Sequence, residues 1–347
     1  MRIAVVGGGP GGLFFAAVGK KLDPHWHIDL WDRGPVGGRD GFGVVLPAGL
    51  LGDVGGTDGS SFSAPEARMS CCSDIDIRVD DRQVTSHGHS FAAMGRRRLL
   101  DTLRERCATL GVTLHLNRDA ASIDFLSERY DVVVAADGAN SAVRKARADA
   151  FGTHLSWGCN KYIWLGTDRE FRAFQFAFVR TPRGIVHLHG YPYGESASSI
   201  IVEIPRSLWK DVGLPDADWI SDTFGAVLRG HRIVLGNSRW LDFATVANRT
   251  WRDGNIVLLG DAAHTTHYSV GSGTHLAMAD ARTLAYCLKE HGDISAGLAD
   301  YETLRRRVVA SAQQVARASQ EWFENVADHW GQDIDEFAFG LLTRGVR

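Results

Sequence analysis

Short apolar runs alternate with helix-compatible stretches at the start of the chain. Residues 2–6 are apolar, glycine-rich sequence follows, and residues 12–21 have an apolar pattern compatible with a helix. A second apolar run covers residues 27–32, and Pro24 ends the helix before it. Strand, helix and strand in this order predict that residues 2–32 form one βαβ unit.

The same patterns return later in the chain. Helical spacing at residues 95–110 places Leu99, Leu103 and Cys107 on one face. Apolar runs typical of strands, the last two of them buried parallel strands, cover residues 112–117, 131–138 and 255–264. Helical patterns also cover residues 272–290 and most of 294–347.

The middle of the chain has the period-two pattern of antiparallel strands instead. Aromatic or β-branched runs separated by turn residues cover residues 161–167, 172–181, 184–191 and 198–204. A helix is predicted near residues 206–228, and a further strand near 240–247. Because this pattern interrupts the parallel one, we expect an inserted antiparallel sheet.

Together these patterns predict an α/β fold with an α+β insertion. The Rossmann-like domain is expected to be discontinuous, with residues 1–80, 93–155 and 240–291. The inserted antiparallel-sheet domain is expected to contain residues 81–92 and 156–239, followed by a C-terminal helical segment, 292–347. Residues 33–70 are rich in glycine and lack periodicity, so functional loops are expected there.

Composition narrows the class of protein. Of 347 residues, 44% are hydrophobic and 23% charged, as in globular proteins. A net charge of −3 provides no positive field for nucleic acid. The five cysteines fit neither a zinc site nor a disulfide framework, which favours a reducing compartment, by default the cytoplasm. No uncharged apolar run reaches the roughly 18 residues of a membrane span, so no membrane partner is expected.

A glycine fingerprint follows the first strand. Gly7 permits the tight turn, Gly9 permits close approach of a pyrophosphate, and Gly12 permits close helix packing. Asp32, at the end of the second strand, would accept a bond from a ribose hydroxyl. The alternative is a glycine-rich turn without a ligand, but the complete order of elements favours dinucleotide binding.

Two later motifs carry a resemblance to a known family. Asp137-Gly138 ends one strand, and Gly260-Asp261 ends another, before Gly271 and Gly273. They resemble the motifs of the group A flavin monooxygenases, the para-hydroxybenzoate hydroxylase fold. The resemblance implies that Asp261 binds the FAD ribityl chain and that Asp137 contributes to FAD and nicotinamide binding. It also assigns to the cofactor Arg33, Val44 and Arg96. Each aspartate could instead be a turn or N-cap residue.

A closer resemblance covers nearly the whole chain. The segments GDAAHTTHYSVGSGTHLAMADA and DEFAFGLLTR, among others, resemble monooxygenases of aryl-CoA thioesters and of violacein biosynthesis. The chain departs from them in having Asp32 for a more usual Glu, and His267-Tyr268 where many group A enzymes carry proline. The reductase half fused to some CoA enzymes is also absent, so no second activity is expected.

The resemblance implies a hydroxylation of an electron-rich aromatic ring. FAD, O2 and either NADPH or NADH would be needed, and oxygen would be transferred from a C4a-hydroperoxyflavin. The substrate would be an aryl-CoA thioester, a carrier-linked acyl group, an indole such as tryptophan or a related intermediate. A monomer or homodimer is expected. The alternatives are a catalytically idle flavin-binding redox sensor and a flavin halogenase, although the WxWxIP motif is missing.

Several residues are candidates for the substrate site. Phe174, Phe176 and Phe178 share one face of a predicted strand, either as core or as pocket wall, and core is the favoured interpretation. His187 and His189 also share a face, but without a third ligand no metal is expected. Candidate catalytic and substrate residues, assigned from the resemblance and from their position after Gly-Asp, are His189, Tyr191, His267 and Tyr268. A loop histidine bonded to backbone is an equal alternative for His267.

The basic run near the C-terminus has two interpretations. Arg305, Arg306 and Arg307 are predicted to lie on the exposed side of the C-terminal helix. A CoA phosphate would also suit them.

Overall fold

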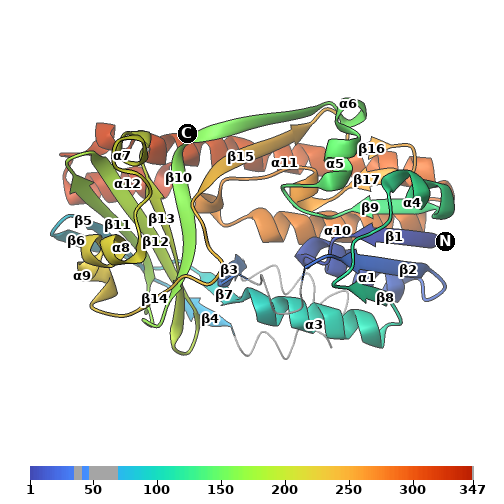
Figure 1. Ribbon diagram of the computed structural model, residues 1–347, viewed down its shortest axis with the longest axis horizontal. Helices are drawn as coiled ribbons and strands as arrows, with labels where there is room; N and C mark the ends of the chain where they lie inside the picture. Colours follow the sequence, from blue (N-terminus) through green and yellow to red (C-terminus); the bar gives the residue numbers. More distant parts are fainter. Residues whose placement is uncertain (35–40, 47–68, 346–347) are drawn as a thin grey trace.

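The computed structural model describes residues 1–34, 41–46 and 69–345. Two lobes lie side by side along the long axis of the molecule (Figure 1). Most of the glycine-rich stretch 33–70, where functional loops were expected, lies outside the described residues.

A six-stranded sheet forms the core of the first lobe. Its strand order is β16 (Arg252–Asp253), β17 (Ile256–Leu258), β9 (Val132–Ala135), β1 (Arg2–Val6), β2 (His27–Asp32) and β8 (Thr113–Leu116). All neighbours are parallel except β16 and β17. Because Ile3, Ala4 and Val5 have no exposed surface, the central strand is covered on both faces, as its unbroken apolar run predicts.

Helices pack on this sheet through their apolar faces. They are α1 (Pro10–Leu22), α3 (Arg96–Thr109), α4 (Ile123–Arg129), α5 (Ala142–Ala146), α6 (Ala148–Phe151) and α10 (Gly273–Glu290). Leu99, Leu103 and Cys107 of α3 are all buried, which confirms the face predicted for this helix. The predicted βαβ unit is present, with β1 pairing parallel to β2 across α1.

The second lobe is built on an eight-stranded, mainly antiparallel sheet. Its order is β14 (Ile233–Val234), β10 (Thr153–Thr167), β13 (Ala197–Ile204), β12 (Gly184–Gly194), β11 (Phe174–Thr181), β5 (Ile75–Val79) and β6 (Arg82–Ser86), with β15 (Leu241–Asn248) also paired to β10. The strand β5 pairs with β11, so it belongs to this sheet although residues up to 80 were expected in the first domain. The period-two pattern of the middle segment is therefore confirmed as an antiparallel sheet.

A small sheet lies where the two lobes meet. Its strands are β3 (Gly43–Leu46), β7 (Phe91–Gly95) and β4 (Ser70–Cys72). The hydroxyl of Tyr191 on β12 donates to the carbonyl oxygen of Gly43 at 2.8 Å. This bond ties the large antiparallel sheet to the small one.

The single helix predicted near residues 206–228 is wrong in one respect, since the segment forms three short helices. They are α7 (Arg206–Val212), α8 (Ala217–Thr223) and α9 (Gly225–Leu228). Gly213 has a φ of +83°, and Pro215 follows it, so the first helix cannot continue.

The C-terminal segment is helical, as predicted. It contains the 31-residue helix α11 (Ile294–Glu324) and the shorter α12 (Ile334–Thr343), and α11 runs along both lobes (Figure 1). The prediction that the whole 305–307 run is exposed is wrong for Arg305, which is buried and lies 2.6 Å from the Asp280 carboxylate on α10. One side of α11 packs on α10, and Arg305 falls on that side.

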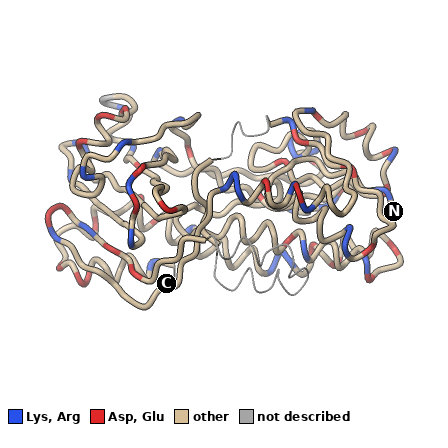
Figure 2. The backbone as a smooth tube through the Cα atoms, turned by 90° about the horizontal axis from the view of Figure 1, so that it is seen from below, with Lys and Arg blue, Asp and Glu red and all other residues tan. Residues whose placement is uncertain are grey.

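Charge is distributed evenly along the chain. Lys and Arg alternate in space with Asp and Glu over both lobes (Figure 2). None of the described helices combines enough length with enough hydrophobicity to cross a membrane. Within the described ranges, no cluster of three or more His, Cys, Asp or Glu could hold a metal ion.

Candidate functional site

The glycine turn between β1 and α1 is tightly closed on one side and open on the other. Gly7 has a φ of +113°, and a side chain there would collide with the backbone of Ala136. A side chain at Gly12 would collide with the carbonyl oxygen of Gly7. At Gly9, by contrast, a Cβ atom would meet nothing within 4 Å. The open position lies at the N-terminus of α1, where backbone N–H groups favour a phosphate.

Asp32 lies beside this turn. A Cβ atom on Gly8 would come within 2.6 Å of Asp32 Oδ2. Asp32 Oδ1 accepts a bond from the backbone N–H of Gly34 at 3.0 Å, and Oδ2 lies 3.8 Å from Arg104 Nη2. The carboxylate is thus fixed next to the glycine turn, whereas the side chain of Arg33 is exposed.

The Asp137-Gly138 segment binds the N-terminus of α5. Asp137 Oδ2 accepts bonds from the backbone N–H groups of Ala142 and Val143, at 2.7 and 3.3 Å. Its Oδ1 is buried and has no hydrogen-bond partner among the described residues. Gly138 adopts a φ of +81°, which turns the chain after β9. Asp137 is therefore not the N-cap residue of α5, which is Ser141, but it binds the first two N–H groups of that helix and keeps one acceptor for a ligand.

Gly260 is held by a buried polar network around Asp280. The N–H of Gly260 donates to Asp280 Oδ2 at 3.2 Å, and the same carboxylate lies 2.6 Å from His264 Nε2. Asp261 lines the central cavity. Desolvation raises the pKa of the Asp261 carboxyl, and the charges of His264 and Arg96 oppose that increase.

A cavity of about 800 Å³ lies between the two lobes. Sequence-predicted residues that line it are Val44, Arg96, Asp261, Gly271, Gly273, Phe176, His189, Tyr191 and Tyr268. Predicted residues that are not in its lining are Gly7, Gly9, Gly12, Asp32, Arg33, Asp137, Gly138, Gly260 and His267. The cavity therefore joins the N-terminus of α10 to the antiparallel sheet.

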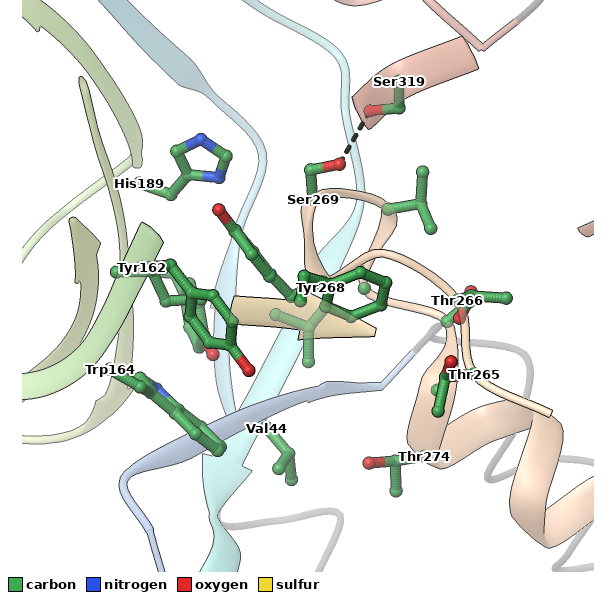
Figure 3. A pocket seen from close by; sticks show the side chains of 18 of the residues that line it. Val44, Tyr162, Trp164, His189, Thr265, Thr266, Tyr268, Ser269, Thr274 and Ser319 are labelled. Carbon is green, nitrogen blue, oxygen red and sulfur yellow. Dashed lines mark hydrogen bonds between the residues drawn. The ribbon is translucent and has the colours of Figure 1, made fainter. Parts of the chain in front are cut away.

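Aromatic and polar side chains meet at the sheet side of the cavity. Tyr268 extends toward His189, and Ser269 bonds to Ser319 of α11 (Figure 3). The ring centroids of Tyr162 and Tyr268 are 4.7 Å apart. Two rings thus lie together in a space that is continuous with the Asp261 side.

A chain of buried polar groups runs behind this wall. His189 Nε2 lies 3.1 Å from His187 Nδ1, and His187 Nε2 lies 3.4 Å from Glu203 Oε1. Glu203 also accepts bonds from Asn160 and from the hydroxyl of Tyr268. Burial raises the pKa of Glu203, but the charge and hydrogen bond of His187 outweigh it and hold the pKa below its usual value.

The two candidate catalytic histidines are kept neutral. Burial lowers the pKa of His189 well below its usual value, and the charges of His187 and Arg344 add to this effect. Burial also lowers the pKa of His267 to about 4. His267 lies behind Tyr268, with its Nδ1 2.8 Å from Ser269 Oγ. Its partner is thus a side chain, and not the backbone as the alternative interpretation supposed.

The phenylalanine face of β11 has both predicted roles. Phe176 and Phe178 pack on Phe323 of α11, in the core that the sheet shares with that helix. Phe174 and Phe176 also line the cavity. The core interpretation holds for Phe178, and Phe176 belongs to both environments.

The sequence predictions missed several site residues, among them Tyr162, Glu203 and Arg344. Glu203 had a visible signal, because it is the one carboxylate in the apolar run SSIIVEI. Arg344 and Tyr162 gave no local signal, since each comes to the cavity only through tertiary packing.

Comparisons with known proteins agree with this geometry. The family described as FAD binding domain matches residues 228–318. Salicyloyl-CoA 5-hydroxylase of Streptomyces sp is 37% identical, over 100% of this chain and 70% of that protein. A 3-hydroxy-4-methyl-anthranilyl-[aryl-carrier protein] 5-monooxygenase of Streptosporangium sibiricum is also 37% identical, over 99% and 94% of the two chains.

A solved structure supports the fold. The tetrameric form of 2-methyl-3-hydroxypyridine-5-carboxylic acid oxygenase superposes with a TM-score of 0.79 and 21% identity, covering 99% of this chain and 95% of that one. The 37% identity to two monooxygenases over nearly the whole chain, together with the shared fold, confirms the resemblance to the group A flavin monooxygenases that was expected from the sequence. The chain belongs to the FAD-dependent aromatic-ring monooxygenases with the para-hydroxybenzoate hydroxylase fold.

Proposed function

We propose that this protein hydroxylates an electron-rich aromatic substrate in the cavity between its lobes, with NADPH or NADH as the electron donor. The observation that carries the proposal is the continuity of one cavity from Asp261 and the N-terminus of α10 to a wall of aromatic rings and a neutral histidine. The ring of the substrate would lie against Tyr162, Tyr268 and Phe176.

The residues fit FAD as the cofactor. The open position at Gly9 suits the pyrophosphate, Asp32 the ribose, and the unpartnered Oδ1 of Asp137 a further donor of the cofactor. Arg96, Asp261, Val44, Gly271 and Gly273 line the cavity and would surround the flavin end. Arg33 and Gly138 lie outside that lining and would contact the cofactor beyond it. When bound, FAD supplies the redox chemistry that activates O2.

The protein's own part in the reaction is to orient the ring, exclude water and manage one proton. His189 is neutral, so it accepts a hydrogen bond from a hydroxyl or amine on the substrate ring. Glu203 can balance a positive charge that develops on the His189 and His187 pair. His267 supports Tyr268 from behind, at a centroid distance of 4.1 Å.

The finer features of the proposal come from the relatives. Their names mention CoA and an aryl-carrier protein, which makes a linked aryl substrate from secondary metabolism the first class to test, with a free indole next. We also propose a cytoplasmic location, in accord with five unpaired cysteines, and a monomer or homodimer. We also propose three domains. The first contains residues 1–80, 93–155 and 240–291, the second contains 81–92 and 156–239, and the third contains 292–347. The strand β5 is assigned to the second domain instead of the first.

The test is an aerobic turnover assay with the purified protein. FAD content is measured first, and NADPH and NADH oxidation is then followed with tryptophan, salicylyl-CoA and anthraniloyl-CoA. A compound that accelerates flavin reduction and consumes oxygen without an equal yield of peroxide supports the proposal. Absence of FAD would refute the cofactor, and bound FAD with no aromatic stimulation would favour an idle redox sensor.

A further inference from the structure

Arg344, the residue that follows α12, brings a guanidinium group to the sheet side of the cavity. Its Nε donates to Ser319 Oγ at 2.8 Å, and its Nη2 donates to the carbonyl oxygen of Ser269 at 2.8 Å. Its Nη1 donates to the carbonyl oxygen of Leu341. These bonds hold the group in one orientation, and within ranges 1–34, 41–46 and 69–345 its further N–H donors have no partner.

Among the residues that the structure describes, no acidic side chain pairs with the guanidinium of Arg344. All three of its hydrogen-bond acceptors are neutral, and in the part of the chain that the structure describes it forms no ion pair. Phe323 and Phe176 lie against it, at 5.0 and 5.5 Å from the ring centroids. Burial alone lowers the pKa of Arg344 to about 10, so the group is charged at neutral pH.

Neighbouring groups do not remove this positive potential. His189 and His267 are neutral, and the Arg344 charge itself contributes to that. Glu203, the nearby carboxylate, is already engaged by Asn160 and Tyr268. A charge buried without a partner is costly, and proteins usually supply a partner of opposite sign.

We propose that Arg344 is a specificity-determining residue that binds an anionic oxygen on the aromatic substrate, a carboxylate or a phenolate. This inference rests on the proposed function, because it needs the aromatic ring to lie in the cavity beside Phe176. The substrate oxygen completes the set of acceptors around the guanidinium and neutralises it. If the substrate is a thioester, its ring hydroxyl is the anionic group.

The test is equilibrium binding to the oxidised FAD-loaded protein, read from the change in flavin absorption. Benzoate and benzamide have nearly the same shape, but only benzoate carries a negative charge and two acceptor oxygens. The probe 4-nitrophenol reports its own phenolate fraction by colour. The variants are Arg344→Met and Arg344→Lys. The matched control is Arg307→Met, because Arg307 is exposed on α11 and lies outside the cavity.

The wild type and Arg307→Met are expected to bind the anionic probe about tenfold or more tightly than Arg344→Met does, with Arg344→Lys intermediate. A lost preference for benzoate over benzamide assigns a carboxylate, and a lower phenolate fraction of bound 4-nitrophenol in Arg344→Met assigns a phenolate. An equal loss of affinity for all probes, or no binding by FAD-loaded wild type, overturns the inference. Failure of the proposed function is separate, since it is measured as missing FAD or missing turnover.

Discussion

Two adjacent arginines of α11 provide a sharp test of where this fold obtains its stability. Arg305 lies 2.6 Å from Asp280 Oδ1, and the Asp280 side chain has 0% exposure. Arg306 lies 3.3 Å from Glu302 Oε1, with its own side chain 47% exposed. The same change, Arg to Gln, at both positions therefore compares a buried ion pair with an exposed one in the same helix.

The expected magnitudes differ several-fold. Arg305→Gln removes one of the two side-chain partners of the buried Asp280 and leaves only the His264 contact, which costs up to about 3–5 kcal/mol of unfolding free energy. Arg306→Gln breaks an exposed pair, which contributes only about 0–1 kcal/mol. For a chain of 347 residues, the buried change corresponds to roughly 4–7 °C in melting temperature. Because Asp280 also binds the N–H of Gly260, Arg305→Gln should also weaken FAD binding.

The pH dependence has a definite sign. Burial raises the pKa of Asp280, but His264 and Arg305 outweigh it and hold the pKa below its usual value. The stabilisation is therefore present above the pKa of an unfolded aspartate, about 3.9, and is lost as the pH falls through the lower folded value. The difference in free energy of unfolding between wild type and Arg305→Gln should be largest at pH 7 and should become smaller below about pH 4.

The assay is urea unfolding of the FAD-loaded proteins, followed by circular dichroism and flavin fluorescence. Equal midpoints for Arg305→Gln and Arg306→Gln would refute the reasoning. The reasoning would also be refuted if the difference in free energy of unfolding between wild type and Arg305→Gln became larger as the pH is lowered.

Three further outcomes are expected. Gly12→Ala forces a methyl group against the Gly7 carbonyl, so this variant should lose both stability and FAD. The apoprotein of Gly9→Ala should melt like wild type, but calorimetry should show about tenfold weaker FAD binding. Equal FAD affinity of the two variants would contradict the proposed pyrophosphate site. Glu203→Gln keeps an acceptor for the Tyr268 hydroxyl but removes the negative charge beside His187, and it should lower kcat about tenfold; an unchanged kcat would be the contrary result. Trp157→Ala, at a cavity residue 62% exposed, should raise the substrate KM without changing Tm, and a large loss of Tm would contradict its assignment to the cavity edge.

Local signals explain which parts of the fold could be predicted from sequence. The βαβ unit was predictable because Gly7, Gly12 and Pro24 mark its turns within 32 residues. The strand β5 was not, because its partner β11 lies about a hundred residues away and only tertiary pairing recruits it. The break at Gly213 and Pro215 had a visible signal that the apolar pattern of 206–228 concealed.

The candidate site divides in the same way. Residues in motifs, such as Asp261, could be assigned because the chemistry needs them at fixed spacing in one segment. Arg305 was assigned to the wrong side of its helix because a sequence pattern does not tell which partner covers each face. Arg344 and Tyr162 are far apart in the sequence, so their presence in one cavity depends on packing and not on spacing.

The length of α11 has a consequence for how the molecule unfolds. Tyr301, near its start, bonds to the carbonyl oxygen of Leu258 in the first lobe, and Phe323, near its end, packs in the core of the second. In between, Gln313 bonds to the carbonyl oxygens of Val246 and Thr265. Unfolding of either lobe would remove the contacts of one end of this helix. Calorimetry should therefore record a single cooperative unfolding transition for both lobes.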